Sequence, residues 1–138
     1  MTRIKYDIRL MKYISIFERI TRSRVKDCFF VKELLMFIVK ENEIGKAIGK
    51  KGINVKMVEK ALNRKIKIVE FSPKMDVFLK NLLYPTQVKG ITEQEGVVTI
   101  EGIDKSGKSI IIGRDSSNLN NTKEIIKRYF EIDNIKVV

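Results

Sequence analysis

An internal repeat is the feature of this chain that most constrains its fold. Residues 48–50 (Ile-Gly-Lys) recur as residues 112–114 (Ile-Gly-Arg), and Asn54 recurs as Asn118, both at an offset of 64 residues. Chance similarity between lysine-rich apolar segments does not account for a shared Gly-basic pair, a common offset and a common element order. We therefore expect two similar α/β units in tandem.

Hydrophobic spacing predicts the same run of strand, strand, glycine turn, helix and strand in each half. Period-two and β-branched stretches predict strands at residues 25–31, 34–39, 66–71, 88–92, 97–103 and 135–138. Helical spacing predicts helices at residues 4–20, from 53 to 62, and around 122–129. A short helix is expected after the cap-like pair Ser72-Pro73, ending at Tyr84-Pro85. The predicted organisation is an N-terminal helix plus first unit over 1–72, a linker helix over 73–85 and a second unit over 86–138.

Positive charge is concentrated in the first of these units. The chain has 28 Lys and Arg against 17 Asp and Glu, a formal net charge of +11. Residues 1–72 hold 18 of these bases and 8 of the acids, a net +10, whereas residues 73–138 hold 10 and 9, a net +1. This balance favours a polyanionic partner for the first unit and a different role for the second.

Several residue types needed for other functions are missing or isolated. The chain has no His, the usual general acid–base, and one cysteine, Cys28, which excludes an internal disulfide or a multi-cysteine metal site. Glu41 and Glu43 are the nearest to a paired carboxylate, but a solvated helix start explains them better. We therefore expect that this protein is not an enzyme and that it binds no cofactor, no metal and no small-molecule substrate. We also expect a reduced, cytoplasmic location and no membrane association, with the first helix docked on its sheet instead.

The first glycine turn, Gly49-Lys50-Lys51-Gly52, has the composition of a phosphate clamp. Glycines at both ends let the backbone approach a ligand, and the helix that follows offers unpaired N–H groups to an anion. Lys50 and Lys51 lie at the opening of this turn, and Lys46 and Lys56 are close to them in the sequence. An ordinary solvated turn is the other interpretation of these lysines. The spacing is not that of a nucleotide-hydrolysing P-loop.

This G-x-x-G turn, set after two strands and before an amphipathic helix, resembles the KH module, which holds the backbone of about four nucleotides. Bases would then lie in an apolar groove to which Ile48 and Ile53 contribute, unless these two belong to the core. The candidate RNA-binding residues are Lys46, Ile48, Gly49, Lys50, Lys51, Gly52, Ile53, Asn54 and Lys56, with Gly113, Arg114 and Asn118 in the second unit.

The second turn departs from this pattern. It is Gly113-Arg114-Asp115-Ser116, in which Ser replaces the closing glycine and Asp115 places a negative charge where phosphate would lie. Such repulsion costs on the order of 1 kcal/mol in a solvated site. We expect the second unit to bind RNA weakly or to have a supporting structural role.

Longer stretches resemble the NusA-type transcription factors. Residues 39–55 are similar to their first KH unit, residues 70–88 to the helix between their KH units, and residues 112–119 to the second turn; the leading helix and residues 23–28 resemble the short archaeal form. The resemblance implies tandem type II KH folds of the α/β (α+β) class, packed as one rigid body. It also implies action on nascent single-stranded RNA in transcription elongation, termination or antitermination, with RNA polymerase as a further candidate partner. A ribosome-associated or RNA-processing KH protein is the alternative.

Overall fold

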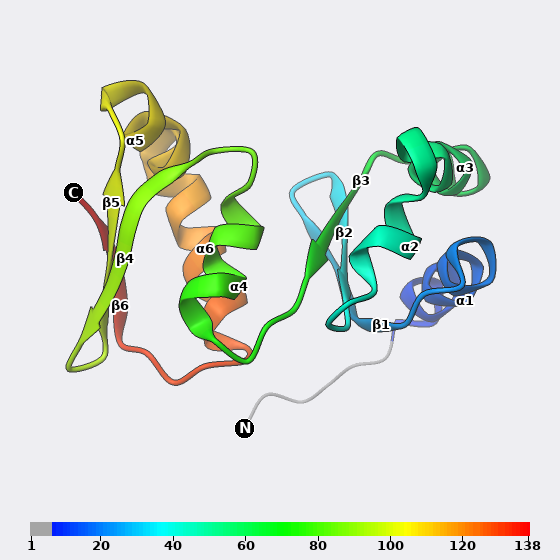
Figure 1. Cartoon of the computed structure of the whole chain (residues 1–138), viewed down its shortest axis with the longest axis horizontal. Coiled ribbons are helices and arrows are strands. Elements are labelled where there is room, and N and C mark those ends of the chain that lie inside the picture. Colours follow the sequence, from blue (N-terminus) through cyan, green and yellow to red (C-terminus); the bar gives the residue numbers. More distant parts are fainter. Residues whose placement is uncertain (1–6) are drawn as a thin grey trace. The chain divides into compact units, whose positions relative to one another are not determined.

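The computed structural model describes residues 7–138 and divides the chain into two compact units, with unit 1 ending at Phe71 and unit 2 spanning Ser72–Val138 (Figure 1). Unit 1 contains α1 (Ile8–Thr21), β1 (Val25–Val31), β2 (Leu34–Val39), α2 (Ile44–Ile48), the 3-10 turn η1 (Lys50–Gly52), α3 (Ile53–Leu62) and β3 (Ile66–Glu70). Residues 4–6, where the first helix was expected to begin, lie outside the described part of the chain.

Unit 2 repeats this order element by element. It contains α4 (Met75–Leu83), β4 (Val88–Gln94), β5 (Val97–Gly102), α5 (Lys105–Ile112), the 3-10 turn η2 (Arg114–Ser116), α6 (Ser117–Lys127) and β6 (Asn134–Val137). Each unit is therefore a helix, two strands, two helices and a strand. This mixed α/β fold is that of tandem KH domains.

Each unit has one three-stranded sheet, ordered β1-β2-β3 or β4-β5-β6. The first two strands form an antiparallel hairpin, and the last runs parallel to the central strand. A parallel neighbour requires a crossover, which α2 and α3 supply in unit 1 and α5 and α6 in unit 2. The repeat extends to an irregularity, because the hairpin register shifts between Val25 and Asp27 and again between Val88 and Gly90.

The core of unit 1 lies between its sheet and its helices. Phe17 of α1 is fully buried and stacks on Phe37 of β2, with ring centroids 4.1 Å apart. Leu35 and Val39 alternate with Phe37 on the same face of β2, and Val58 brings α3 onto this cluster. The first helix thus docks on its own sheet, as its apolar spacing predicts.

The helix expected as a linker, α4, packs inside unit 2. Its Phe78 meets Tyr129 edge to face, with ring centroids 5.5 Å apart, and Leu79 and Leu82 are buried with it. The predicted start of this helix is wrong. Ser72 is not its N-cap, because the helix begins at Met75, and the Ser72 hydroxyl accepts a hydrogen bond from the Lys74 N–H at 3.1 Å. That bond closes a turn before the helix.

Cys28 is a buried residue of β1, as its apolar neighbours predict. Burial raises the pKa of its thiol to about 12, and the adjacent Asp27 carboxylate adds to the rise. Because the thiolate is the reactive form, we expect a thiol reagent at pH 8 to label the folded protein at least about a hundredfold more slowly than the urea-unfolded chain. Rapid labelling in native buffer would contradict this burial.

Neither a membrane-spanning helix nor a metal-binding cluster is found in the described part of the chain. Among residues 7–138, no helix has both the length and the apolar character needed to cross a membrane. Within the same residues, no group of three or more His, Cys, Asp or Glu side chains gathers where a metal ion could be held.

Candidate nucleic-acid interface

The glycine turn of unit 1 joins α2 to α3 through three residues with positive φ. Gly49 has φ 75° and ψ 170°, a region that is essentially closed to residues with a side chain. Lys51 at φ 55° and Gly52 at φ 74° then turn the chain left-handed before α3 begins at Ile53. The Gly49 and Gly52 N–H groups donate to the carbonyls of Gly45 and Gly49, at 3.0 and 3.1 Å, and so fix this backbone path, while the side chains of Lys50 and Lys51 are exposed.

Asn54 stabilises the turn from the protein side. Its side-chain amide donates a hydrogen bond to the Lys46 carbonyl at 2.8 Å, and so ties the first turn of α3 to the end of α2. A Cβ built on Gly49 would lie 2.8 Å from Asn54 Cγ, which is closer than side chains pack. Asn54 is one of the residues expected to contact RNA, and in the structure its amide nitrogen donates to the backbone of α2.

Unit 2 contains the same brace. Asn118 donates to the Ile110 carbonyl at 2.8 Å, and a Cβ on Gly113 would lie 2.6 Å from Asn118 Cγ. The five-residue spacing from glycine to asparagine is therefore a structural signature of this turn. It explains why the Gly–Asn pair recurs at the 64-residue offset even though the charges around it change.

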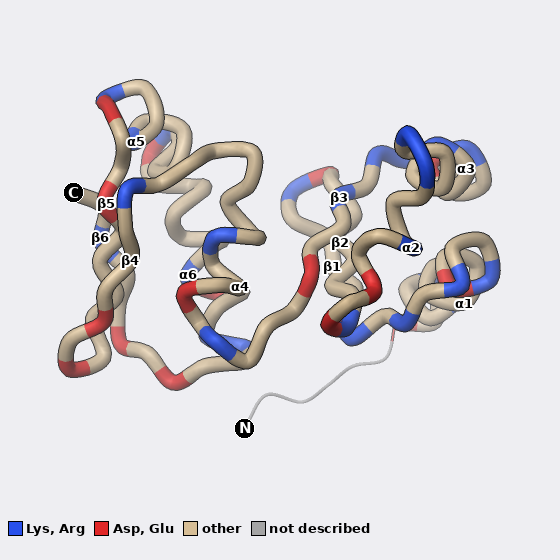
Figure 2. The backbone as a smooth tube through the Cα atoms, viewed as in Figure 1, with Lys and Arg blue, Asp and Glu red and all other residues tan. Residues whose placement is uncertain are grey.

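The lysines of the first turn differ in their availability. Lys50, Lys51 and Lys56 are exposed, and within residues 7–138 none of them forms an ion pair with a carboxylate. Figure 2 shows this positive charge gathered where α2 passes into α3. The N-terminus of α3 adds a partial positive charge at the same place.

Lys46, in contrast, has a partner. Its ammonium lies 3.0 Å from the Glu43 carboxylate, which also accepts a hydrogen bond from the Arg24 N–H at 2.8 Å. The hydrogen bond from Lys46 is the largest of several effects that lower the pKa of Glu43. The carboxylate thus stays charged, and paired, below the pH at which an ordinary Glu takes up a proton.

Apolar side chains flank the turn on the surface. Ile48 is 39% exposed and Ile53 is 54% exposed, so neither is buried in the core. Met57, one helical turn after Ile53, is 49% exposed and was not among the expected site residues. We call Ile48, Ile53 and Met57 the apolar patch. Exposed apolar side chains beside a basic turn offer nucleobases a surface to pack on.

The second turn shares the backbone of the first but not its chemistry. Gly113 has φ 75° and ψ 172°, and Asp115 and Ser116 follow at φ 53° and 62°, close to the values in unit 1. Asp115 takes the place of Lys51. At the positions 64 residues after Ile53 and Met57 stand Ser117 and Asn121, so most of the apolar patch is replaced by polar side chains.

Comparisons with known proteins agree with this architecture. Residues 30–74 match the family model described as a NusA-like second KH domain. The match covers the end of β1 and all of β2, α2, the basic turn, α3 and β3 of unit 1. Unit 1 therefore matches the model of a second KH domain, whereas its residues 39–55 were expected to resemble a first one. The chain also aligns with the crystal structure of APE1850 at a TM-score of 0.72 and 26% identity, covering 96% of this chain and all of the other.

Similar sequences extend over both units. A protein of Methanocaldococcus jannaschii is 31% identical over the whole of this chain and 77% of its own length, and one of Methanococcus vannielii is 32% identical over 99% and 80%. One from Halococcus morrhuae is 28% identical over 98% of this chain and 99% of its own. All three are named probable transcription termination protein NusA. The chain therefore belongs to the NusA family.

Proposed function

We propose that this protein is a transcription factor that binds single-stranded RNA by holding its backbone at the basic turn, residues 49–52 of unit 1. The observation that carries the proposal is the combination found there: a glycine-closed turn at a helix N-terminus with Lys50 and Lys51 exposed and outside any described ion pair. Amides and ammonium groups together suit a phosphodiester.

The basic turn and the apolar patch contact different parts of the RNA. Lys50, Lys51 and Lys56 attract phosphates, and Gly49 and Gly52 let the strand approach the backbone. The bases then lie with their flat faces on the apolar patch. These faces are accessible in a single strand and are common to all four bases, so this contact favours single strands and depends little on sequence. Lys46 and Asn54 support the turn from the protein side.

Unit 2 has a supporting role in this proposal. Its turn keeps the brace of Asn118 but carries Asp115, and its half of the chain has a net charge of only +1. Gly113 and Arg114 are then weak contacts at most.

The name that these relatives carry supports an activity in transcription termination, and elongation or antitermination would use the same contact with nascent RNA. RNA polymerase is the protein partner that such a role requires. The cytoplasm, where archaeal-type transcription takes place, is the proposed location.

A binding titration tests the RNA contact. We expect a labelled 12-nucleotide RNA to bind the full chain more tightly than the corresponding duplex, and the logarithm of the affinity to fall with the logarithm of salt at a slope of about −2 if three phosphates are neutralised. An affinity that does not change between two salt concentrations would contradict a phosphate clamp.

Cross-linking in cells tests the assignment to transcription. Recovery of nascent messenger RNA with the protein supports it. Recovery of ribosomal RNA instead would contradict it and indicate a ribosome-associated or RNA-processing protein, because one fold serves many functions.

A further inference from the structure

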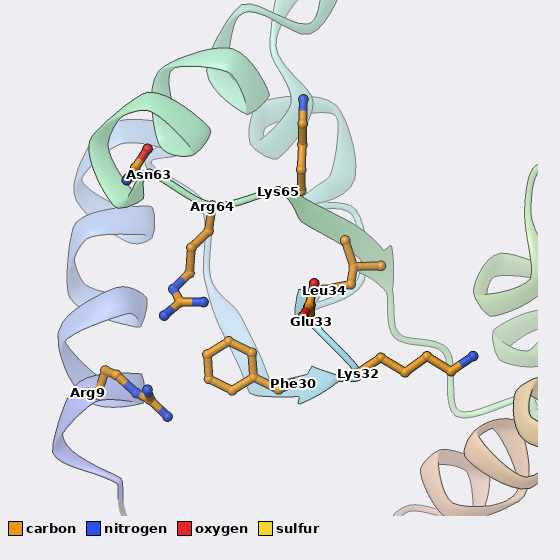
Figure 3. A pocket seen from close by; sticks show the side chains of 8 residues that line it. All are labelled: Arg9, Phe30, Lys32, Glu33, Leu34, Asn63, Arg64 and Lys65. Atoms are coloured by element: carbon orange, nitrogen blue, oxygen red, sulfur yellow. The ribbon is translucent and has the colours of Figure 1, made fainter.

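Unit 1 has a pocket that the proposed RNA contact does not use. It has a volume of about 680 Å³ and opens between the start of α1, the turn joining β1 to β2, and the segment after α3 (Figure 3). Its lining includes the cationic residues Arg9, Lys32, Arg64 and Lys65, the aromatic ring of Phe30 and one acidic side chain, Glu33.

Two arginines meet one aromatic ring at the centre of this pocket. The guanidinium carbon of Arg9 lies 4.9 Å from the centroid of Phe30, and that of Arg64 lies 5.1 Å from it. In Figure 3 both guanidinium groups point toward the space beside this ring, whereas Lys32 and Lys65 point away from it. We call Arg9, Phe30 and Arg64 the Arg-Phe-Arg cluster.

Arg64 is held in place but retains binding capacity. Its Nε donates to the Tyr13 hydroxyl at 3.1 Å, which orients the guanidinium plane. It forms no ion pair with any carboxylate of residues 7–138. Among the carboxylates of residues 7–138, Arg9 pairs with Asp7 alone, at 3.5 Å, and both side chains are about half exposed. A guanidinium fixed in this way, with its terminal nitrogens toward a cavity, suits a phosphate.

The pocket is separate from the basic turn. The turn precedes the first residue of α3, Ile53, while Asn63 and Arg64 follow its last residue, Leu62. A helix of 10 residues separates the two by about 15 Å. One KH turn holds about four nucleotides, so a longer strand is needed to occupy both places.

We propose that the Arg-Phe-Arg cluster binds one further nucleotide of the same RNA. The phosphate of this nucleotide lies on the two guanidinium groups, and its base lies against the flat faces of Phe30 and the arginines. This inference rests on the proposed RNA-binding function and extends it along α3. The volume suits one ligand of nucleotide size. A carboxylate of an acidic protein segment would pair with the arginines but has no flat aromatic face to lie against the stack that Arg9, Phe30 and Arg64 form, so a nucleotide uses the site more fully.

A tryptophan placed in the cluster reports on base stacking directly. The chain has no Trp, so Phe30→Trp in the full chain gives a single indole fluorophore that keeps the cation–π contacts. We expect a 12-nucleotide RNA to quench this emission, saturating at the concentration at which the labelled RNA itself is bound. Tyr84→Trp, at a site 69% exposed in unit 2, is the control and should change little.

Charge variants test the same site without altering the ring. Because each phosphate contact to a single strand contributes about 0.7 to the salt slope, Arg64→Gln should reduce that slope by about this amount and weaken 12-nucleotide binding roughly three- to tenfold. Arg19→Gln, which removes the same charge from an exposed site on α1, is the matched control. Arg64→Lys should recover part of the affinity, since it restores charge but not the planar fork.

The outcomes separate this inference from the proposed function. If RNA binds and depends on Lys50 and Lys51 while the indole of the Phe30→Trp variant does not respond and Arg64→Gln matches Arg19→Gln, the second contact is overturned and the first stands. A response of that indole to adenosine monophosphate but not to RNA would overturn the second RNA contact and assign the pocket to a free nucleotide. A response to polyglutamate alone would overturn it in favour of an acidic protein. Absence of any RNA binding overturns both proposals.

Discussion

Replacing Lys50 and Lys51 together with Asp is expected to weaken binding of single-stranded RNA by on the order of a hundredfold or more at low salt. Each substitution removes an attraction to phosphate and adds a repulsion, and each such term is worth on the order of 1 kcal/mol in a solvated site. The salt slope should fall by about 1.4, because two phosphate contacts of about 0.7 each are lost. Fluorescence anisotropy with a labelled 12-nucleotide RNA measures both quantities.

The fold should survive this change. Both side chains are exposed, and neither forms an ion pair within residues 7–138, so circular dichroism and the free energy of unfolding should stay close to those of the parent chain. Arg114→Asp is the control in unit 2, where the backbone path is the same but Asp115 already opposes phosphate. A larger loss of affinity from Arg114→Asp than from the double variant would reverse the proposed ranking of the two turns.

Much of the fold is predictable from the sequence because both units depend on local, periodic signals. The strands of β-branched and aromatic residues and the α3 face of Val58 and Leu62 lie where their spacing predicts. The equivalence of α1 and α4 was not predicted. The first has 14 residues and the second 9, and they share no motif at the repeat offset, so only their packing on corresponding sheets reveals it.

The candidate site was partly predictable. Glycines at both ends of a basic turn predict its conformation, because few residues tolerate positive φ. The amide of Asn54 can bind a nucleotide or a carbonyl, and sequence alone does not show its 2.8 Å hydrogen bond to the Lys46 carbonyl. The Glu43–Lys46 ion pair and the exposed Met57 did leave signals, an i,i+3 charge pair and an i,i+4 apolar spacing from Ile53.

The Arg-Phe-Arg cluster left no such signal. Its three members lie on α1, on β1 and after α3, and 55 positions separate Arg9 from Arg64. Sequence spacing predicts neighbours along one helix or one strand, whereas this site forms where the start of α1 meets the ends of β1 and α3. A basic composition predicts that phosphate is attracted to unit 1, but not that two separate places on it can receive a strand.

The glycine at the base of the turn should be the most sensitive position of the site. Gly49→Ala is expected to destabilise the protein by about 3 kcal/mol, since it forces a side chain into a backbone region that is nearly exclusive to glycine and into contact with Asn54. RNA affinity should fall about tenfold as well, because displacing Asn54 breaks its hydrogen bond to the Lys46 carbonyl and shifts the backbone of the loop. Urea unfolding and RNA titration measure the two effects.

Three other glycines separate the causes of this loss. Gly45→Ala meets nothing within 4 Å and lies in α2, so it should stabilise the chain by about 0.5–1 kcal/mol. Gly52→Ala also meets open space but has φ 74°, so it should cost about 1 kcal/mol from backbone strain alone. Gly113→Ala repeats the clash in unit 2 and should cost stability while leaving RNA affinity nearly unchanged. Equal losses of affinity at Gly49 and Gly113 would show that both turns hold RNA, and a Gly49→Ala variant as stable as Gly45→Ala would show that Asn54 does not brace the turn.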